Sequence, residues 1–415
     1  MPFFTPKKMK GRNKIRRIRG KERKVIPPYE DTYRKTEAKN WDGICIANGD
    51  ENDYSEKIEN YIENSINATT TSNLFKRFLI GQGDLNYNDW QVNKKQKFDE
   101  FIDDLGDEYK DHRGFYVLVK PNALGEPKEY KQIPFTNVRI KNVDSNGNIT
   151  KFLVSQNWQD YKDWIDEKKD TEKYEFLPFN PNTEITKQQI ANAGGLEKFK
   201  GSIFYFNGGK AKYHYPLSFI HSVINDCDSD FRIQLHRNKR VRGGVLNKKI
   251  IITPPQMPKH LDLPDDQLDD DALEQKRKIE NEVSIAEQMK NFVGAENNEG
   301  FLHLEMEFDQ DDIDKLVKVI DIESISEDGY FEKNETQIAT NLKRAYFNPP
   351  PILLESDNSF FGSSGEAIRE AMEFYDKNVM HERFKFERSL KNLFGKEIKL
   401  VSLLEENSNT ANTDD

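Results

Sequence analysis

Residues 347–375, FNPPPILLESDNSFFGSSGEAIREAMEFY, decide how the second half of the chain is organised. Pro349, Pro350 and Pro351 cannot donate backbone hydrogen bonds, and a proline disfavours helical geometry in the residue before it. They therefore end the helical pattern that runs over residues 327–346. Ser363 and Glu366 then match a capping box, which predicts the start of another helix. The stretch is expected to form a helix end, a rigid turn, a projecting loop and a long capped helix.

Two more helices are expected around this stretch. Apolar residues at helical spacing carry the final helix to about Phe394, with Ile368, Met372 and Tyr375 in its stripe. Upstream, a helix is expected to open at Pro216, because proline is favoured at the first helical position, and to close near Gly243. Its last two turns are basic: Arg232, His236, Arg237, Lys239, Arg240 and Arg242. Two explanations stay open for this cluster: the cations complement the helix macrodipole, or they contact phosphate groups.

The remaining segments alternate between helical and strand patterns without an internal repeat. Residues 245–308 predict a compact α/β insert, with the strands VLNKKIIIT and GFLHLEMEF around an amphipathic helix. Residues 56–79 predict two helices broken at NATTTSN. Residues 115–140 predict a strand, a Gly/Pro turn and two short strands, and GSIFYFNGG predicts a further strand. Residues 156–187 are too weakly patterned to assign.

The composition favours a chain that shares its burial with neighbours. Of 415 residues, 35% are hydrophobic and 32% are charged, which is lean for a self-contained globule of this length. No apolar run reaches the roughly 20 residues that a bilayer crossing needs, and no secretory signal is expected. Two cysteines, Cys45 and Cys227, make a disulfide framework unexpected and fit a reducing compartment.

The charge is unevenly distributed along the chain. The net charge is −10, yet residues 7–24 hold eleven Lys or Arg in eighteen positions. We expect residues 1–35 to be a disordered basic arm, because like charges repel and little can be buried. Binding nucleic acid through phosphate contacts and acting as a solvated tail are both open roles for the arm. The acidic residues 403–415 are expected to be a disordered tail.

Catalytic patterns are weak. The GSSGE segment before the last helix lacks the Lys-Ser/Thr ending of a P-loop, so capping is favoured over phosphate binding. The seven histidines show no metal-ligand spacing except for His214 and His221, which are too far apart for adjacent helical turns. Neither cysteine lies in a C-x-x-C pair. We therefore expect no catalytic residues, no cofactor and no metal site.

Four segments carry a resemblance to the portal proteins of tailed bacteriophages, in particular the siphophage-like type. They are YHYPLSFIHSVIND, HRNKRVRGGVL, NETQIATNLKRAYFNPPPILLE and SGEAIREAMEFYDKNVMHERFKFERSLKNLF. The likeness covers residues 203–394, about half of the chain, and is loose upstream of them. Three departures from the family pattern fall in the turn: Asn348 replaces the usual Gly-Val position, a third proline is present, and Glu355 replaces a common glycine.

The resemblance implies an α+β portal-type fold, with a helical stem, an α/β clip, a mixed wing and a long C-terminal helix, that assembles into a ring. Residues 36–215 would form a mixed wing, 216–242 the first stem helix and 243–320 an α/β clip. Residues 321–347 would hold the second stem helix, with its helical pattern over 327–346. Residues 348–364 would be a tunnel loop, and 365–402 the long wing helix with a C-terminal segment.

The resemblance also implies a function and partners. A portal is a channel at one capsid vertex for packaging DNA, retaining and ejecting the genome, and attaching the tail or connector. The implied partners are eleven further copies in a dodecameric ring, double-stranded DNA, the terminase large subunit, a major capsid or scaffolding protein and a head-completion or adaptor protein, with no membrane. The implied location is the virion, and the host cytoplasm during assembly.

Particular residues follow from this mapping. The tunnel loop would include Pro349, Pro350, Pro351, Asn358, Phe360, Phe361 and Gly362. Arg240, Arg242, Lys248 and Lys249 are candidates for contacts with DNA or with an adjacent subunit. Two other classes are weighed against the portal: a virion protein that binds nucleic acid through its basic arm, and a metal-dependent nuclease. No sequence motif supports the nuclease.

Overall fold

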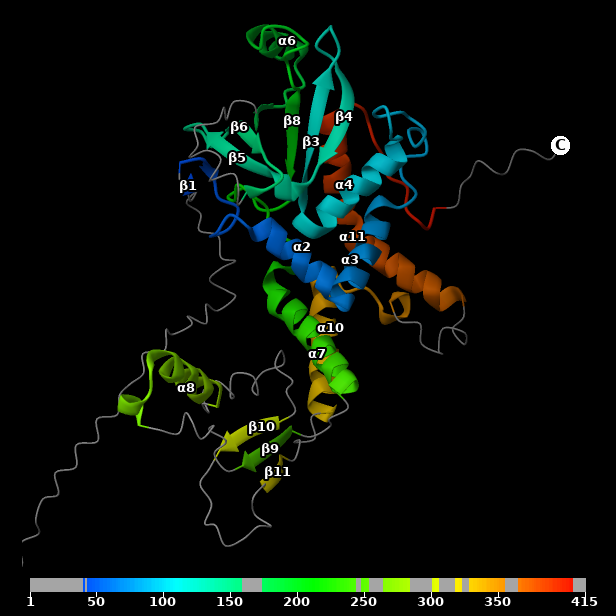
Figure 1. Ribbon diagram of the computed structural model, residues 1–415. Coiled ribbons are helices and arrows are strands. Elements are labelled where there is room, and N and C mark those ends of the chain that lie inside the picture. The colour runs from blue at the N-terminus through cyan, green and yellow to red at the C-terminus, as the bar shows by residue number, and fades with distance from the viewer. Residues whose placement is uncertain are drawn as a thin grey trace, which may run out of the picture.

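The computed structural model describes residues 40–41, 43–158, 174–243, 248–253, 264–283, 301–305, 318–322, 328–354 and 365–405. Figure 1 shows an elongated molecule with a body of sheet and helices at the top and two helices, α7 and α10, below it. A small sheet and the helix α8 lie at the bottom. This mixture of helices and sheets confirms the α+β class.

A six-stranded sheet forms the upper part of the body. Its strand order is β4-β3-β8-β7-β6-β5, and its pairs are antiparallel except for β7 and β8. The strands are β3 (Gly114–Pro121), β4 (Pro127–Ile133), β5 (Val138–Val143), β6 (Ile149–Val154), β7 (Glu175–Pro178) and β8 (Ser202–Asn207). The strands predicted from residues 115–140 and from GSIFYFNGG are confirmed as β3, β4, β5 and β8. The sequence pattern had not indicated β6 and β7.

Helices pack against this sheet and supply most of the core. They are α2 (Tyr54–Asn64), α3 (Ile66–Ile80), α4 (Phe98–His112) and α11 (Gly365–Phe394). Two other parts lie outside this group: α6 (Thr183–Asn192) is at the top of Figure 1, and β1 (Asn40–Trp41) pairs with β2 (Cys45–Ile46). Large aromatic side chains fill the space between α4, β3 and α11, among them the fully buried Phe115, Tyr109 and Phe386. The end of α11 predicted at Phe394 is confirmed. Ser363, half of the predicted capping box, lies outside the described residues.

The predicted break between the first two helices is in the wrong place. NATTTSN lies inside α3, and the chain leaves helical geometry only at Ser65, where φ is −105° and ψ is 117°. The Ser65 hydroxyl accepts a hydrogen bond from the Ala68 amide at 3.1 Å and so caps α3. The threonines stay helical because tertiary packing outweighs their weak propensity: Thr71 is buried.

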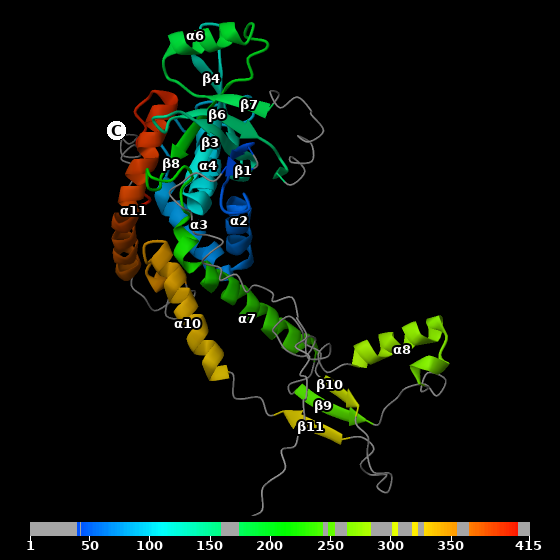
Figure 2. The same ribbon diagram turned by 90° about the vertical axis from the view of Figure 1, so that its left-hand side faces the viewer.

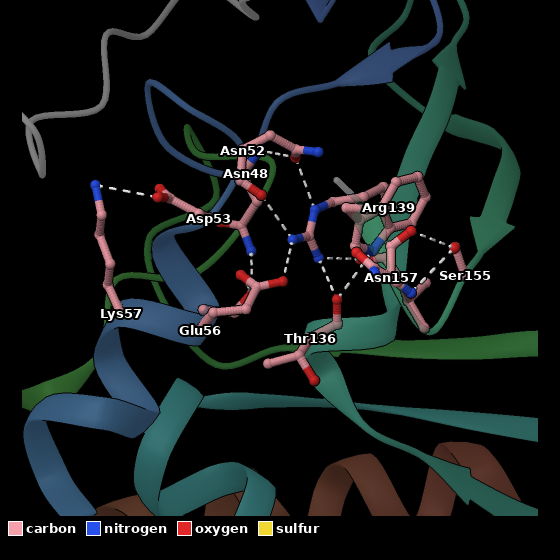
Figure 3. A network of polar contacts seen from close by, with 12 residues as sticks. Asn48, Asn52, Asp53, Glu56, Lys57, Thr136, Arg139, Ser155 and Asn157 are labelled. Carbon is pink, nitrogen blue, oxygen red and sulfur yellow. Dashed lines mark hydrogen bonds and ion pairs between the residues drawn. The ribbon is translucent and has the colours of Figure 1, made fainter. Parts of the chain in front are cut away.

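One fully buried arginine joins the start of α2 to the sheet (Figure 3). Arg139 on β5 donates to the side-chain oxygen and the carbonyl of Asn52, to the carbonyl of Thr136 and to Glu56, each at 2.7 Å. Its guanidinium lies 5.1 Å from the ring centre of Trp158. A charge taken out of water is tolerated only when its donors are satisfied in this way. The contacts hold the 48–56 segment, with its left-handed Asn52, against the sheet.

The lower sheet confirms the predicted α/β insert and adds a strand. β9 (Lys248–Thr253) is central, parallel to β10 (Phe301–Glu305) and antiparallel to β11 (Lys318–Ile322). The predicted amphipathic helix is α8 (Asp270–Val283), with Asp270 and Asp271 at its positive N-terminal end. The strand β11 was not predicted, and it continues to Ile322, past the expected boundary at residue 320.

The helix expected from Pro216 begins later. A 3-10 turn, η3 (Phe219–Val223), precedes α7 (Ile224–Gly243). The amide of Ser218 donates to the Tyr54 hydroxyl at 3.1 Å, which holds Ser218 in extended geometry with ψ of 157°. A long-range contact with α2 therefore delays the helix, and proline chemistry alone does not reveal it. The partner helix α10 (Asp328–Ala345) lies within the predicted 327–346.

Within the part of the chain that the structure describes, no helix combines the length and apolar character needed to cross a bilayer.

A buried acid–base cluster connects α2, α4 and η1 (Phe135–Asn137). His112 is 3% exposed, lies 3.0 Å from a Glu59 oxygen and stacks on the ring of Phe135. Burial raises the pKa of Glu108 to about 7, against the opposing charge of His112 and the hydrogen bond from the Phe135 amide. Burial works to lower the pKa of His112, but the hydrogen bond to Glu59 and the charge of Glu108 raise it above its usual value.

This cluster predicts a pH-dependent stability. The pKa of Glu108 rises from 4.5 to about 7 on folding, so its stabilising contribution is present below pH 4.5 and is lost as the pH rises through 7. Relative to Glu108→Gln, the native chain should lose at most about 1.4 kcal/mol of unfolding free energy per pH unit over this window. Urea unfolding at pH 5 and pH 7 measures the change. Glu197→Gln, an exposed control, should show no such trend, and equal slopes for both variants would refute the assignment.

Candidate functional site

The two helices α7 and α10 leave the body as a pair and lead to the lower sheet (Figures 1 and 2). Their upper ends belong to the main core, where Ile338 and Leu342 of α10 are buried with Ile224 and Cys227 of α7. Further down, Arg237 and Glu335 face each other through two N–O pairs of 2.7 Å. At the upper end, the side-chain amide of Asn341 donates to Asp226 at 3.2 Å beside these apolar residues. The upper end of the pair is therefore largely apolar, and the contact between Arg237 and Glu335 further down is ionic.

A buried carboxylate fastens α7 to the body. Asp230, 5% exposed, accepts a hydrogen bond from the Ser65 hydroxyl at 2.6 Å. It also accepts from the backbone and side-chain amides of Asn67, at 3.2 and 3.1 Å. These donors lie at the N-terminus of α3, where the helix macrodipole favours a negative charge. The upper end of the helix pair thus has a fixed attachment to α3.

The end of α10 has an unusual backbone. Phe347 and Asn348 have φ of +65° and +54°, a region that residues other than glycine rarely adopt. The amide of Asn348 donates to the carbonyl of Lys343 at 2.7 Å, five residues back. This is the long hydrogen bond of a Schellman motif, with Phe347 in the position where glycine is usual. The reversal is thus set before the prolines begin.

The prolines then fix the direction in which the chain leaves the turn. Pro349 is buried, and Pro351 opens the 3-10 turn η6 (Pro351–Leu353). The amide of Leu353 donates to the carbonyl of Pro350 at 3.0 Å. Ring closure holds φ of each proline near −65°, so three in succession leave little freedom. The described chain continues to Leu354 and resumes at Gly365, the first residue of α11.

Aromatic rings hold the left-handed turn in place. The ring of Phe347 stacks on Phe75 and meets the edge of Phe219, each with centroids 5.7 Å apart. Tyr346 contacts the same two rings and is fully buried. A left-handed backbone costs about 1–2 kcal/mol for a residue with a side chain. The packing of Phe347 between rings from α3 and η3 is the compensating contact.

Two tyrosine hydroxyls tie the turn to α11 and α4. Tyr375 on α11 donates to the carbonyl of Tyr346 at 2.9 Å, and Tyr346 donates to the carbonyl of Lys110 on α4 at 3.2 Å. Burial raises the pKa of both hydroxyls above their usual range, so both remain protonated donors at neutral pH. The turn that ends α10 and the helix that resumes after residue 364 are therefore held by the same contacts.

A second polar centre fixes α11 against α4. Glu382 is 2% exposed and accepts hydrogen bonds from the Tyr109 hydroxyl and the Lys385 amine, each at 2.7 Å. Arg113 donates to it at 3.2 Å. Burial opposes ionisation, but the hydrogen bonds from Lys385 and Tyr109 and the charge of Arg113 hold the pKa of Glu382 below its usual value. At neutral pH this carboxylate is ionised, and its hydrogen bonds hold α11 against α4.

The structure places some of the predicted site residues and leaves others undescribed. Pro349, Pro350 and Pro351 form the turn described above. Asn358, Phe360, Phe361 and Gly362 lie outside the described residues, as do the basic arm and the residues after 405. For the four basic candidates the structure describes only the backbone. Arg240 and Arg242 lie near the end of α7, and Lys248 and Lys249 begin β9. Contact of these four with DNA or with a neighbour stays a prediction.

The histidines and cysteines of the described residues do not gather into a metal-binding group. No group of three His, Cys, Asp or Glu side chains within them has metal-binding geometry. His221 lies 3.1 Å from the Tyr54 hydroxyl. Cys45 and Cys227 are both free and buried, and burial raises the pKa of each thiol to about 12. Non-enzymatic function stays an expectation.

Sequence reasoning missed the groups that make the turn rigid. Asp230, Glu382 and Tyr375 bind across 29 to 273 residues of sequence, so local spacing does not connect them to their partners. The sequence pattern predicts Tyr375 as one residue of the apolar stripe of the final helix. Nothing in that pattern indicates a hydrogen-bond partner for its hydroxyl. Phe347 had one available signal: its place directly before Asn348 and the prolines, where helices commonly end in left-handed geometry.

The left-handed backbone at Phe347 predicts that replacement by glycine destabilises the chain less than replacement by alanine. Phe347→Ala should destabilise the chain by about 2–3 kcal/mol because the ring contacts are lost. Phe347→Gly should be more stable than Phe347→Ala by about 1 kcal/mol, because glycine adopts positive φ freely. Denaturant unfolding of both variants measures the difference. As the control, Ala345→Gly within α10 should instead destabilise by about 1 kcal/mol. If Phe347→Ala were the more stable of the two Phe347 variants, the strain would not exist.

Comparison with known proteins gives similarities of fold only. No protein-family model matches the sequence, and no curated protein matches it significantly. A chain from the neck of a native gene transfer agent particle, computed with C12 symmetry, is 13% identical with a TM-score of 0.46; the match covers 85% of this chain and 84% of that one. A chain from the neck of an empty particle, computed with C6 symmetry, is also 13% identical, with a TM-score of 0.49; the match covers 86% of this chain and 85% of that one.

A crystal structure of an HK97-family phage portal protein from Corynebacterium diphtheriae is also similar to this chain. It is 11% identical with a TM-score of 0.38, and the match covers 82% of this chain and 94% of that one. The solved structures that resemble this chain thus include a phage portal protein, the family that the sequence resembles.

Proposed function

We propose that this chain is the subunit of a ring-shaped phage portal, a conduit for double-stranded DNA at one vertex of the capsid. The observation that carries the proposal is the rigid turn at residues 346–351, held by α3, η3, α4 and α11. It fixes the direction of the chain up to Leu354, and Tyr375 ties α11, which begins at Gly365, to the same turn. Two anchors on either side of residues 355–364 would suit a constriction that this segment forms inside a channel.

The helix pair supports the same proposal. α7 and α10 connect the body to a separate small sheet, and Asp230 fastens the upper end of the pair to α3. In a ring of such chains, the paired helices would form the channel wall and the small sheet one rim of the channel. The acidic balance of the chain suits DNA that slides, because each phosphate neutralised by a basic side chain adds salt-dependent affinity.

The finer assignments belong to this proposal. The ring is a dodecamer through which the terminase large subunit packages DNA and from which the genome is later ejected. Residues 243–320 form the rim that meets the terminase and then the head-completion or adaptor protein. The body meets the capsid or scaffolding protein, and the assembled ring resides in the virion after assembly in the host cytoplasm. The chain itself catalyses no reaction.

The test is imaging of purified protein by negative-stain electron microscopy. The native chain should form rings with a central hole. Removing residues 355–362 leaves the turn and η6 intact, so rings should keep their copy number and show a wider hole at the level of the body. Removing residues 144–147, the exposed tip between β5 and β6, is the matched control and should leave the hole unchanged. A native chain that stays monomeric would contradict the proposal.

The basic arm favours a second candidate function, a virion protein that binds nucleic acid through residues 7–24. Removing residues 1–24 separates the two candidates. A portal should still form rings without the arm. An arm-dependent binder should lose its affinity for a 30-base-pair duplex in a fluorescence anisotropy titration, and its native form should show no rings. Replacing the eleven basic residues by serine at constant length controls for the deletion itself.

A further inference from the structure

One face of the long helix α11 is exposed and apolar in its middle. Phe374, Met380 and Phe384 are 53%, 42% and 52% exposed. Phe374, Lys377, His381, Phe384 and Arg388 follow one another at spacings of three and four residues, so they lie along one stripe of the helix. The opposite stripe, with Val379 and Phe386, is fully buried. Exposed aromatic side chains gathered on one face are typical of a contact surface.

The exposed stripe is basic at its C-terminal end. Residues 377–391 hold five Lys or Arg and two Glu, and Glu382 is buried among its hydrogen-bond partners. Lys377, Arg388 and Lys391 are exposed. Lys391 pairs with Glu397 at 2.7 Å, and both of these side chains are exposed. The surface is thus aromatic and positively charged.

The helix α2 carries the opposite charge. Residues 50–63 hold six Asp or Glu and one Lys. Most of these charges are used internally, because Glu56 pairs with Arg139, Glu59 lies against His112, and Glu51 and Asp53 pair with Lys57. Asn60, Glu63 and Asn64 are exposed at the C-terminal half of the helix. The exposed outer face of α2 is therefore polar and carries the negative charge of Glu63, without the aromatic stripe of α11.

These two faces lie on opposite sides of the body. Figure 2 shows α11 at one edge of the body and α2 at the other. In Figure 1, which views the molecule along this line, the N-terminal end of α11 extends to the right. That end is Gly365, where the described chain resumes after Leu354. If that side faces the channel, as the proposed function requires, α2 and α11 lie on the two flanks where neighbours in a ring would meet.

We infer that the exposed stripe of α11 packs on the outer face of α2 in the next copy of this chain. The inference rests on the proposed function, because it names the contact between ring neighbours. Two different, complementary surfaces make a heterologous contact, which closes into a ring when the rotation between copies allows. The aromatic side chains supply burial, and Lys377 and Arg388 face the negative charge of Glu63. Exposed ion pairs add little stability alone, but complementary charge selects the partner surface.

Cysteine cross-linking tests the contact. The two native cysteines are buried, so introduced thiols report on the surface alone. Asn60→Cys combined with Phe384→Cys, oxidised by copper phenanthroline, should give a ladder of covalent oligomers up to the ring size on non-reducing gels. Each single variant should give none, and Leu124→Cys combined with Phe384→Cys is the control, because Leu124 is exposed at the β3–β4 turn, away from both flanks.

Each outcome decides something different. Rings in negative stain without a ladder from the double variant would overturn the contact and leave the portal proposal standing. A monomer without a ladder would overturn both. Covalent dimers from Phe384→Cys alone would show that two α11 helices face each other, which also overturns the heterologous contact.

A charge exchange gives a second readout that leaves the fold intact. Arg388 and Glu63 are both exposed, so substituting them should not affect folding. Arg388→Glu should raise the protein concentration at half assembly by roughly tenfold in low salt, because like charges then face each other. Adding Glu63→Arg should restore assembly, and the effect should shrink in 0.5 M salt. Mass photometry measures the assembly. No effect of Arg388→Glu, or no restoration by the second change, would refute the pairing.

Discussion

The left-handed backbone at Phe347 and Asn348 is the constraint on which the rest of the structure depends. It ends α10 and sets the direction in which the three prolines continue the chain. It persists because Phe75 and Phe219 enclose the ring of Phe347 and because Tyr375 binds the carbonyl of Tyr346. Strain of this kind is retained where the surrounding structure determines the conformation, and such sites are commonly functional.

Buried polar groups distribute this rigidity through the body. Asp230 joins α7 to α3, Glu382 joins α11 to α4, and Arg139 joins the start of α2 to the sheet. Each group has several satisfied hydrogen bonds, which makes its burial tolerable. Such groups are sensitive to position, since a small displacement leaves a buried charge without its donors. Fully hydrogen-bonded buried networks of this kind make the body rigid.

The proposed ring gives a physical reason for features that a monomer leaves unexplained. The hydrophobic share of 35% is lean for 415 residues, and the elongated shape raises the surface further. Contacts between copies would supply burial that one chain lacks. The aromatic stripe of α11 and the polar face of α2 with Glu63 offer two unlike surfaces on opposite flanks, and one chain cannot bring them together. Their complementarity is satisfied only between copies.

The sequence determined the local elements wherever a single hydrophobic period or a helix-breaking residue dominated the pattern. The prolines located the end of α10, and the apolar stripe of α11 extended to Phe394. The apolar and aromatic runs with their Gly/Pro turns indicated β3 and β8, and an alternating pattern indicated β10. These are effects of neighbours within a few residues, which a linear pattern contains. The portal resemblance added an expected order of parts, and the helix pair, small sheet and long helix follow that order.

Tertiary structure decided the rest, because the deciding contacts join residues far apart in sequence. Tyr54 delays the start of α7 through Ser218, and Ser65 sets the break between α2 and α3, where local propensity had favoured NATTTSN. The strands β6 and β7 depend on pairing with their neighbours, since their own pattern is weak. The turn at Phe347 is left-handed because rings from α3 and η3 surround it. Burial of a side chain by a distant partner is a property of the folded chain, and no local pattern contains it.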